Sequence, residues 1–106
     1  MELRALNINN FDQIIYESGE NCIVVFSRKN CHVCKEVVPM VEECGEKYSD
    51  RMKFYRVDVE EERSLFNRFS LKGVPSILFF IDGEYHGRLA GNVEEDQLEE
   101  KIMEIF

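Results

Sequence analysis

The chain has 106 residues, a net charge of −8 and four cysteines, and 44% of its residues are hydrophobic. This length fits one domain, residues 1–106, with an ordinary apolar core and no room for a second domain. Four cysteines are too few for a secreted disulfide scaffold, in which cysteine exceeds roughly 8–10% of the residues. The acidic balance opposes bulk electrostatic attraction to nucleic acid or to an anionic membrane surface.

Neither a leader peptide nor a membrane span is apparent. Met1–Arg4 is not a basic segment leading into an apolar run of the kind that signals secretion. The longest apolar runs, 22–26 and 77–81, have five residues each, far short of the roughly 20 that a bilayer-spanning helix needs. We therefore expect a cytoplasmic protein with neither nucleic acid nor membrane among its partners.

The first half of the chain predicts two helices on either side of a buried strand. Apolar residues at helical spacing predict a short helix over about 10–18, closed by Gly19 in a left-handed cap. The β-branched and aromatic run 22–26 predicts a strand buried on both faces and central in a sheet. Over 31–48, apolar residues recur at steps of three and four, which predicts a long amphipathic helix kinked at Pro39.

The third quarter of the chain predicts a second strand and a second short helix. Apolar and polar residues alternate over 52–59, as in a half-buried strand. The apolar residues over 65–69 then indicate a short helix.

The last quarter predicts a hairpin and a closing helix. Strands over 76–81 and 84–90 are joined by Asp82-Gly83, a two-residue turn signal typical of antiparallel hairpins. Apolar residues from Val93 to Ile105 then follow helical spacing. The whole order indicates an α/β fold with a central mixed β-sheet and helices on both faces.

The candidate site is the pair Cys31 and Cys34, placed after the buried strand at the predicted start of a helix. Free backbone amides and the positive end of the helix dipole favour a thiolate at Cys31, which we interpret as the nucleophile. Cys34, one turn later on the same face and more buried, is the expected resolving thiol. Between them lie His32 and Val33, and an imidazolium at His32 would favour the thiolate further and make the pair more oxidising.

Two other interpretations of the cysteines stay open. Zinc binding also uses a C-x-x-C pair, but the ligands left to complete a tetrahedral set are poorly placed, so we expect no metal. A pair of inert core cysteines is possible because free cysteine is often buried, although the helix start argues against it. For Cys22, inside a predicted strand, and Cys44, on an apolar helix stripe, a structural role is the favoured interpretation.

Several segments spread along the chain together match one known pattern: Ile23–Phe26, Cys31-x-x-Cys34, Lys35, Pro39, Val57–Val59 and Lys72–Ser76. Through these segments the chain resembles the thioredoxin family over almost its whole length. The resemblance implies the thioredoxin fold and a cis peptide bond between Val74 and Pro75 that faces the cysteine pair. It also implies that the backbone around Gly73 and Val74 docks an extended substrate, with Asn30 on the same surface. A cis X–Pro bond marks a turn at a strand start where an edge can accept another chain; an ordinary trans-proline is the alternative.

Three departures separate this chain from the family pattern. Asn30 stands where the family has a tryptophan, and the chain contains no tryptophan at all. Val25 replaces the buried aspartate thought to act as general base for the resolving thiol, and Arg56 thereby loses that partner. The insert His32-Val33 replaces Gly-Pro, and inserts of this kind distinguish reductants from oxidants.

The leading expectation is a dithiol–disulfide oxidoreductase that reduces protein disulfides, acts as a monomer and needs no cofactor. The resemblance implies a thioredoxin reductase or another dithiol as electron donor. The alternative is a redox-sensing or partner-binding module without turnover, which the missing aspartate and tryptophan slightly favour. A glutathione-dependent enzyme similar to glutaredoxin is less favoured, because no cluster for the glutathione carboxylates is evident.

Overall fold

The computed structural model describes residues 2–106. Among them, no helix combines the length and the apolar character needed to cross a membrane. The elements are β1 (Arg4–Ala5), η1 (Gln13–Glu17), β2 (Cys22–Ser27), α1 (Cys34–Lys47), β3 (Lys53–Asp58), α2 (Arg63–Arg68), β4 (Ser76–Ile81), β5 (Glu84–Ala90) and α3 (Glu95–Ile105).

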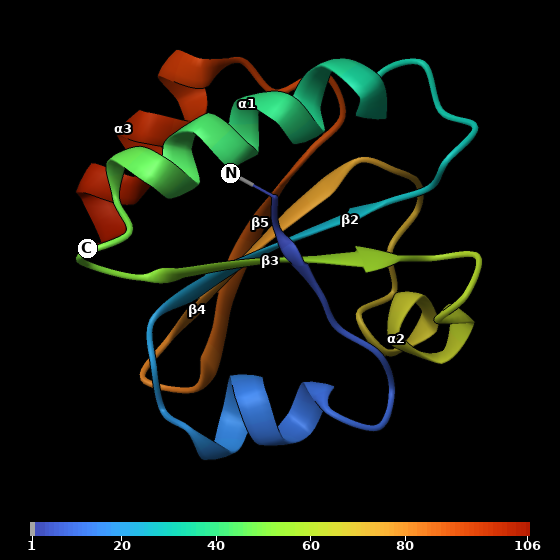
Figure 1. Ribbon diagram of the computed structural model, residues 1–106, viewed down its shortest axis with the longest axis horizontal. Helices are drawn as coiled ribbons and strands as arrows, with labels where there is room; N and C mark the ends of the chain where they lie inside the picture. Colours follow the sequence, from blue (N-terminus) through green and yellow to red (C-terminus); the bar gives the residue numbers. More distant parts are fainter. Residues whose placement is uncertain (1) are drawn as a thin grey trace.

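The strands of this region form one mixed sheet in the order β1-β3-β2-β4-β5. β1 and β2 run parallel to β3, whereas β4 is antiparallel to β2, and β5 is antiparallel to β4. Helices α1 and α3 cover one face of the sheet, and η1 and α2 cover the other (Figure 1). This arrangement confirms the predicted central mixed sheet with helices on both faces.

The central strand β2 is fixed by a hydrophobic core on each side. Side chains of a strand alternate between its two faces, so Ile23 and Val25 pack with Val37 of α1, while Val24 and Phe26 pack toward η1 and α2. All four of these β2 side chains are fully buried. Burial of such side chains contributes roughly 1.5–3 kcal/mol each. The carboxyl end of β2, where the loop to the cysteine pair begins, is therefore held firmly.

The hairpin of β4 and β5 has the predicted bounds and the predicted turn. Asp82 and Gly83 both have positive φ, 52° and 79°, as a two-residue turn of type I′ requires. A Cβ at Gly83 would lie 2.7 Å from the carbonyl oxygen of Tyr16, so the turn is also tightly packed. Glycine is needed here for its conformation and for its small size.

Strand β1 was not predicted from the sequence. It has only two residues, both exposed, and two residues are too few to show a period. Its flanking residues Leu3 and Leu6 are each 3% exposed and contribute one to each core. β1 therefore forms through pairing with β3 at the sheet edge rather than through local preference.

The predicted bounds of the other helices and strands need modest corrections. The first helix, predicted over 10–18, contains wide π-type turns at Gln13–Glu17, where the amide of Ser18 donates to the carbonyl of Gln13 at 3.2 Å. Gly19 follows with φ 68°, as its predicted cap requires. The ends of β3 and α2 differ by one or two residues from the predicted ones, which is ordinary fraying of element termini.

Candidate redox site

The predicted cysteine pair forms a disulfide between Cys31 and Cys34, with the two Cα atoms 5.2 Å apart. The long helix begins at Cys34, not at Cys31 as predicted. His32 and Val33 form a turn first, and the carbonyl of Cys31 then accepts the amide of Lys35 at 3.2 Å. Cys31 thus lies just ahead of the first turn of α1, where the helix amides point outward.

The two sulfurs have unequal surroundings, as predicted. The backbone amide of Cys34 donates to the sulfur of Cys31 at 3.2 Å, so the positive end of α1 acts on Cys31. Cys31 is 8% exposed and Cys34 is 3% exposed. Cys31 is therefore the less buried residue of the pair, and its sulfur is the one that the helix amide stabilises in a negatively charged form.

A distant loop completes the site around Cys31. The bond between Val74 and Pro75 is cis, which confirms the expectation drawn from the resemblance. The carbonyl oxygen of Val74 lies 4.0 Å from the sulfur of Cys31. Neighbouring backbone groups are used internally: the carbonyl of Gly73 accepts the hydroxyl of Ser76 at 2.9 Å, and that of Pro75 accepts an amide at the end of β5. This loop is consequently fixed beside the pair.

The remaining predicted site residues lie at the rim. Asn30 is exposed and Gly73 is exposed, while Val33 is half-buried against the core under α1. The side chain of His32 is 90% exposed, and its Nε2 lies 4.0 Å from Oε1 of Glu36, one helical turn later. The partner that the structure gives His32 is therefore a carboxylate at the helix surface.

Val25 and Arg56 stand opposite each other in the paired strands β2 and β3. Val25 is fully buried in hydrocarbon and supplies no proton acceptor. The guanidinium of Arg56 donates from Nε to the carbonyl of Leu3 at 3.1 Å, and its Nη2 lies 3.9 Å from the carboxylate of Glu2. Arg56 has thus found partners in the N-terminal segment.

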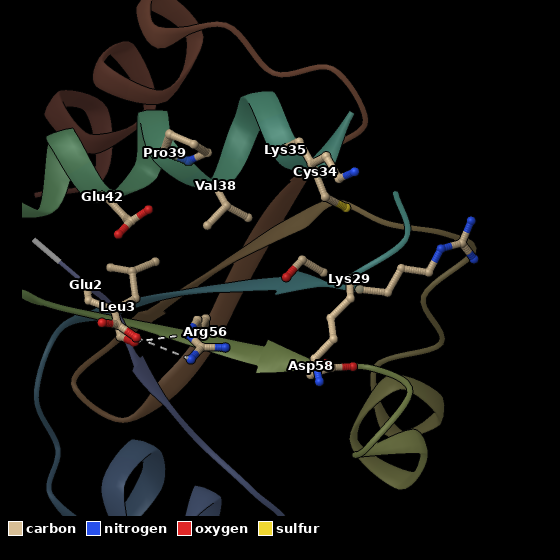
Figure 2. A pocket seen from close by; sticks show the side chains of 12 residues that line it. Glu2, Leu3, Lys29, Cys34, Lys35, Val38, Pro39, Glu42, Arg56 and Asp58 are labelled. Atoms are coloured by element: carbon tan, nitrogen blue, oxygen red, sulfur yellow. Dashed lines mark hydrogen bonds and ion pairs between the residues drawn. The ribbon is translucent and has the colours of Figure 1, made fainter. Parts of the chain in front are cut away.

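A cavity of about 340 Å³ reaches Cys34 from the side of the N-terminal segment. Figure 2 shows Cys34, Val38 and Glu42 of α1 at its upper wall, with Arg56 and Asp58 of β3 across from them. Sequence reasoning missed this cavity. Cys34, Val38 and Glu42 follow one another at steps of four residues, which indicated that they share one side of a helix. No pattern in the sequence near them indicated that β3 would lie opposite.

The other two cysteines are free and buried, in agreement with a structural role. Burial raises the pKa of the Cys22 thiol to about 12, with a smaller contribution from Glu20. Burial likewise raises the pKa of the Cys44 thiol to about 11, helped by Glu99. Since the thiolate is the reactive form, neither side chain is prepared for exchange. Within residues 2–106, no group of three or more potential ligands is arranged to hold a metal ion.

Comparisons with known proteins agree with this geometry. The thioredoxin family model matches residues 2–104. The chain is 25% identical over 101 residues to the chloroplastic thioredoxin M-type of Pisum sativum, covering 95% of this chain and 59% of that protein. It is 30% identical over 94 residues to the chloroplastic thioredoxin Y2 of Arabidopsis thaliana, covering 89% and 56%.

Thioredoxin 1 of the cyanobacterium Synechococcus elongatus matches this chain over most of the length of both proteins. The identity is 30% over 88 residues, which covers 83% of this chain and 82% of that protein. By contrast, the chain spans about three fifths of the length of the first chloroplastic relatives, 59% and 61% for two of them.

Proposed function

The chain belongs to the thioredoxin family, and from that membership we propose that it is a protein dithiol–disulfide oxidoreductase working through Cys31 and Cys34. One observation carries the proposal: the two cysteines are joined at the start of α1, with the sulfur of Cys31 beside the carbonyl of Val74. A reactive disulfide next to backbone at the start of a strand suits an extended peptide segment as substrate.

The proposed reaction has two exchange steps. The thiolate of Cys31 attacks one sulfur of a substrate disulfide; the substrate S–S bond breaks, and the departing sulfur leaves as a thiolate that takes up a proton. The thiol of Cys34 then loses its proton and attacks the sulfur of Cys31, which releases the second substrate thiolate. The substrate has gained two electrons, and the protein holds the Cys31–Cys34 disulfide described above.

A further turnover needs a dithiol donor that reduces this disulfide by the same chemistry in reverse, and we propose a thioredoxin reductase or an equivalent dithiol. We also propose that the protein works in a reducing compartment such as the cytoplasm. The support is that Cys22 and Cys44 are both free thiols, as is usual where cellular dithiols keep cysteines reduced.

The test is catalysed reduction of a protein disulfide such as that of insulin, with dithiothreitol as electron donor. We expect turnover by the wild type and none by Cys31→Ser, because the attacking sulfur is missing. Cys34→Ser should accumulate a mixed disulfide on Cys31, visible by mass spectrometry, because the releasing thiol is missing.

Absence of turnover by the wild type would overturn the proposed enzyme. If Cys34→Ser nevertheless captured a protein through Cys31, the alternative of a redox-sensing module without turnover would take its place. The variant Cys22→Ser, which changes a thiol outside the site, provides the matched control and should turn over as the wild type does.

A further inference from the structure

The proposed function requires that the Cys34 thiol lose its proton, and the buried strand β2 offers no group that could accept it. The cavity at Cys34 is therefore relevant to this step. Cys34 is 3% exposed, yet it must lose a proton before it can attack the mixed disulfide, because only a thiolate is nucleophilic. Val25, in the neighbouring central strand, is fully buried hydrocarbon and accepts no proton. The cavity that Cys34 lines therefore offers a route by which this proton can leave.

Several ionisable side chains surround this cavity. Lysine and arginine are ordinarily protonated near neutral pH, so they are not available as proton acceptors there. Carboxylates are ordinarily ionised and can accept a proton. Apart from Glu42, the charged residues at the cavity are Glu2 from the N-terminal segment, Arg28 and Lys29 from the loop after β2, Lys35 from α1, and Arg56 and Asp58 from β3.

Two of the three carboxylates are engaged elsewhere. The carboxylate of Glu2 is 87% exposed and lies 3.9 Å from the guanidinium of Arg56. The Oδ1 of Asp58 accepts the backbone amide of Glu60 at 2.9 Å and thereby holds the turn after β3. Each of these two carboxylates therefore already has a partner of its own.

Glu42 differs from both. It is half-buried, and none of the hydrogen bonds or ion pairs formed within residues 2–106 uses its carboxylate. It lies on the same face of α1 as Cys34 and Val38, since the three are spaced by four residues, and Figure 2 shows its side chain directed from the helix into the cavity. Eight residues at a rise of about 1.5 Å separate the two Cα atoms of Cys34 and Glu42 by about 12 Å.

We propose that Glu42 accepts the proton of the Cys34 thiol through water in this cavity, an inference that rests on the proposed function. The Cys34 S–H proton passes by way of water to the Glu42 carboxylate, and the Cys34 thiolate attacks the sulfur of Cys31. The bond from Cys31 to the substrate sulfur breaks, and the substrate leaves as a thiolate that takes a proton from solvent. Glu42 then returns its proton to water.

The test separates the two exchange steps in one reaction with 5,5′-dithiobis(2-nitrobenzoate). The reduced protein releases one coloured thiolate when Cys31 attacks, at a rate that depends on reagent concentration. It releases a second when Cys34 resolves the mixed disulfide, at a rate that does not. Stopped-flow absorbance measures both phases from about pH 5 to about pH 9 for the wild type, Glu42→Gln, Asp58→Asn and the control Glu43→Gln, which removes a carboxylate from the exposed side of α1.

In Glu42→Gln, the second phase should be slowed by about 10–100-fold near pH 6. This is at or below the weak end of general-base catalysis, which typically contributes about 100–10,000-fold. The deficit should shrink as the pH rises, because hydroxide then takes the proton. The first phase should stay within about twofold of the wild type. Release of no more than two thiolates shows that the variant is folded, because the buried Cys22 and Cys44 then stay unreactive. Glu43→Gln should match the wild type in both phases.

Three outcomes would overturn the inference while leaving the proposed function intact: a normal second phase in Glu42→Gln, a deficit of equal size at every pH, or the whole deficit in Asp58→Asn instead. A wild type that releases only one thiolate would overturn the dithiol exchange itself, and the inference with it.

Discussion

The backbone amide of Cys34 donates to the sulfur of Cys31 at 3.2 Å. Cys34, the more deeply buried cysteine of the pair, thus supplies the backbone amide that stabilises negative charge on the sulfur of Cys31. The polarity of the pair is built into the first turn of α1, since the amides there have no partner within the helix and carry its positive end.

The first prediction concerns the order of reactivity. In the reduced protein near neutral pH, a limiting amount of iodoacetamide should alkylate Cys31 at least about tenfold faster than Cys34, because alkylation needs the thiolate and the helix amides favour it at Cys31. Peptide mass spectrometry after short reaction times measures the ratio. Equal labelling, or preference for Cys34, would contradict the assignment of Cys31 as nucleophile.

A second prediction concerns His32. Its positive form favours the thiolate of Cys31, so His32→Ala should make the reduction potential more negative. The side chain is 90% exposed and faces Glu36, so the effect should be small, about 10 mV, as for an exposed charge pair of about 0.5 kcal/mol. Equilibration with a glutathione redox buffer near pH 6 measures it.

The matched variant for His32 is Glu36→Gln, which removes the opposing charge at the same helix start. It should shift the potential in the opposite direction, to less negative values. If His32→Ala left the potential unchanged, the proposed tuning by His32 would be wrong.

Val25→Asp tests whether the site under Cys34 tolerates a charge. Val25 is fully buried in hydrocarbon, and Arg56, opposite it in β3, already binds the carbonyl of Leu3 and faces Glu2. A carboxylate at position 25 would therefore lack a free counter-charge and should cost about 3 kcal/mol of unfolding free energy at neutral pH. Burial favours the protonated form, so the pKa of the introduced carboxyl is raised. Stability should therefore be greatest at low pH and fall as the pH rises above the ordinary carboxyl value of about 4.

Denaturant unfolding of Val25→Asp and Val25→Asn near pH 4 and pH 7.5 measures this dependence. The asparagine variant has nearly the same shape but no charge, so its destabilisation should be independent of pH. If Val25→Asp and Val25→Asn were equally stable at neutral pH, a positive group would be neutralising the aspartate, and the predicted cost of a buried charge would be wrong.

The buried thiols predict a loss of stability at alkaline pH. The folded protein holds the protons of Cys22 and Cys44, with pKa values of about 12 and about 11, whereas cysteines in an unfolded chain lose them near the ordinary value of 9.0. The unfolded state thus binds fewer protons above pH 9, and stability falls as the pH rises toward those values. The expected loss is on the order of 1 kcal/mol per thiol by pH 10.

Comparing the wild type with Cys44→Ala isolates this effect. The variant should be less stable at neutral pH because it leaves a small cavity, but its stability should decline less between pH 8 and pH 10. A steeper decline in the variant would contradict the role assigned to the buried thiol.

Segments with strong local patterns were predicted well. The uninterrupted apolar run at 22–26 and the Asp82-Gly83 turn predicted a central strand and a hairpin, and both formed at those positions. Segments with weak local patterns were not. β1 has two residues and forms only against β3, and the start of the long helix moved from Cys31 to Cys34, because apolar spacing cannot distinguish a preceding turn from the first helical turn.

The sequence by itself determined where the candidate redox pair lies, because the two cysteines are three residues apart and the helix α1 begins at the second of them. Only the tertiary structure decided what surrounds them. The carbonyl of Val74 lies 4.0 Å from Cys31 although 43 residues separate them, and Glu42 shares a cavity with Asp58 through the packing of α1 against the sheet. The spacing of residues along the chain predicts which side chains are neighbours within one helix or strand. Contacts between elements arise when the two hydrophobic cores pack, and no local pattern predicts which elements then meet.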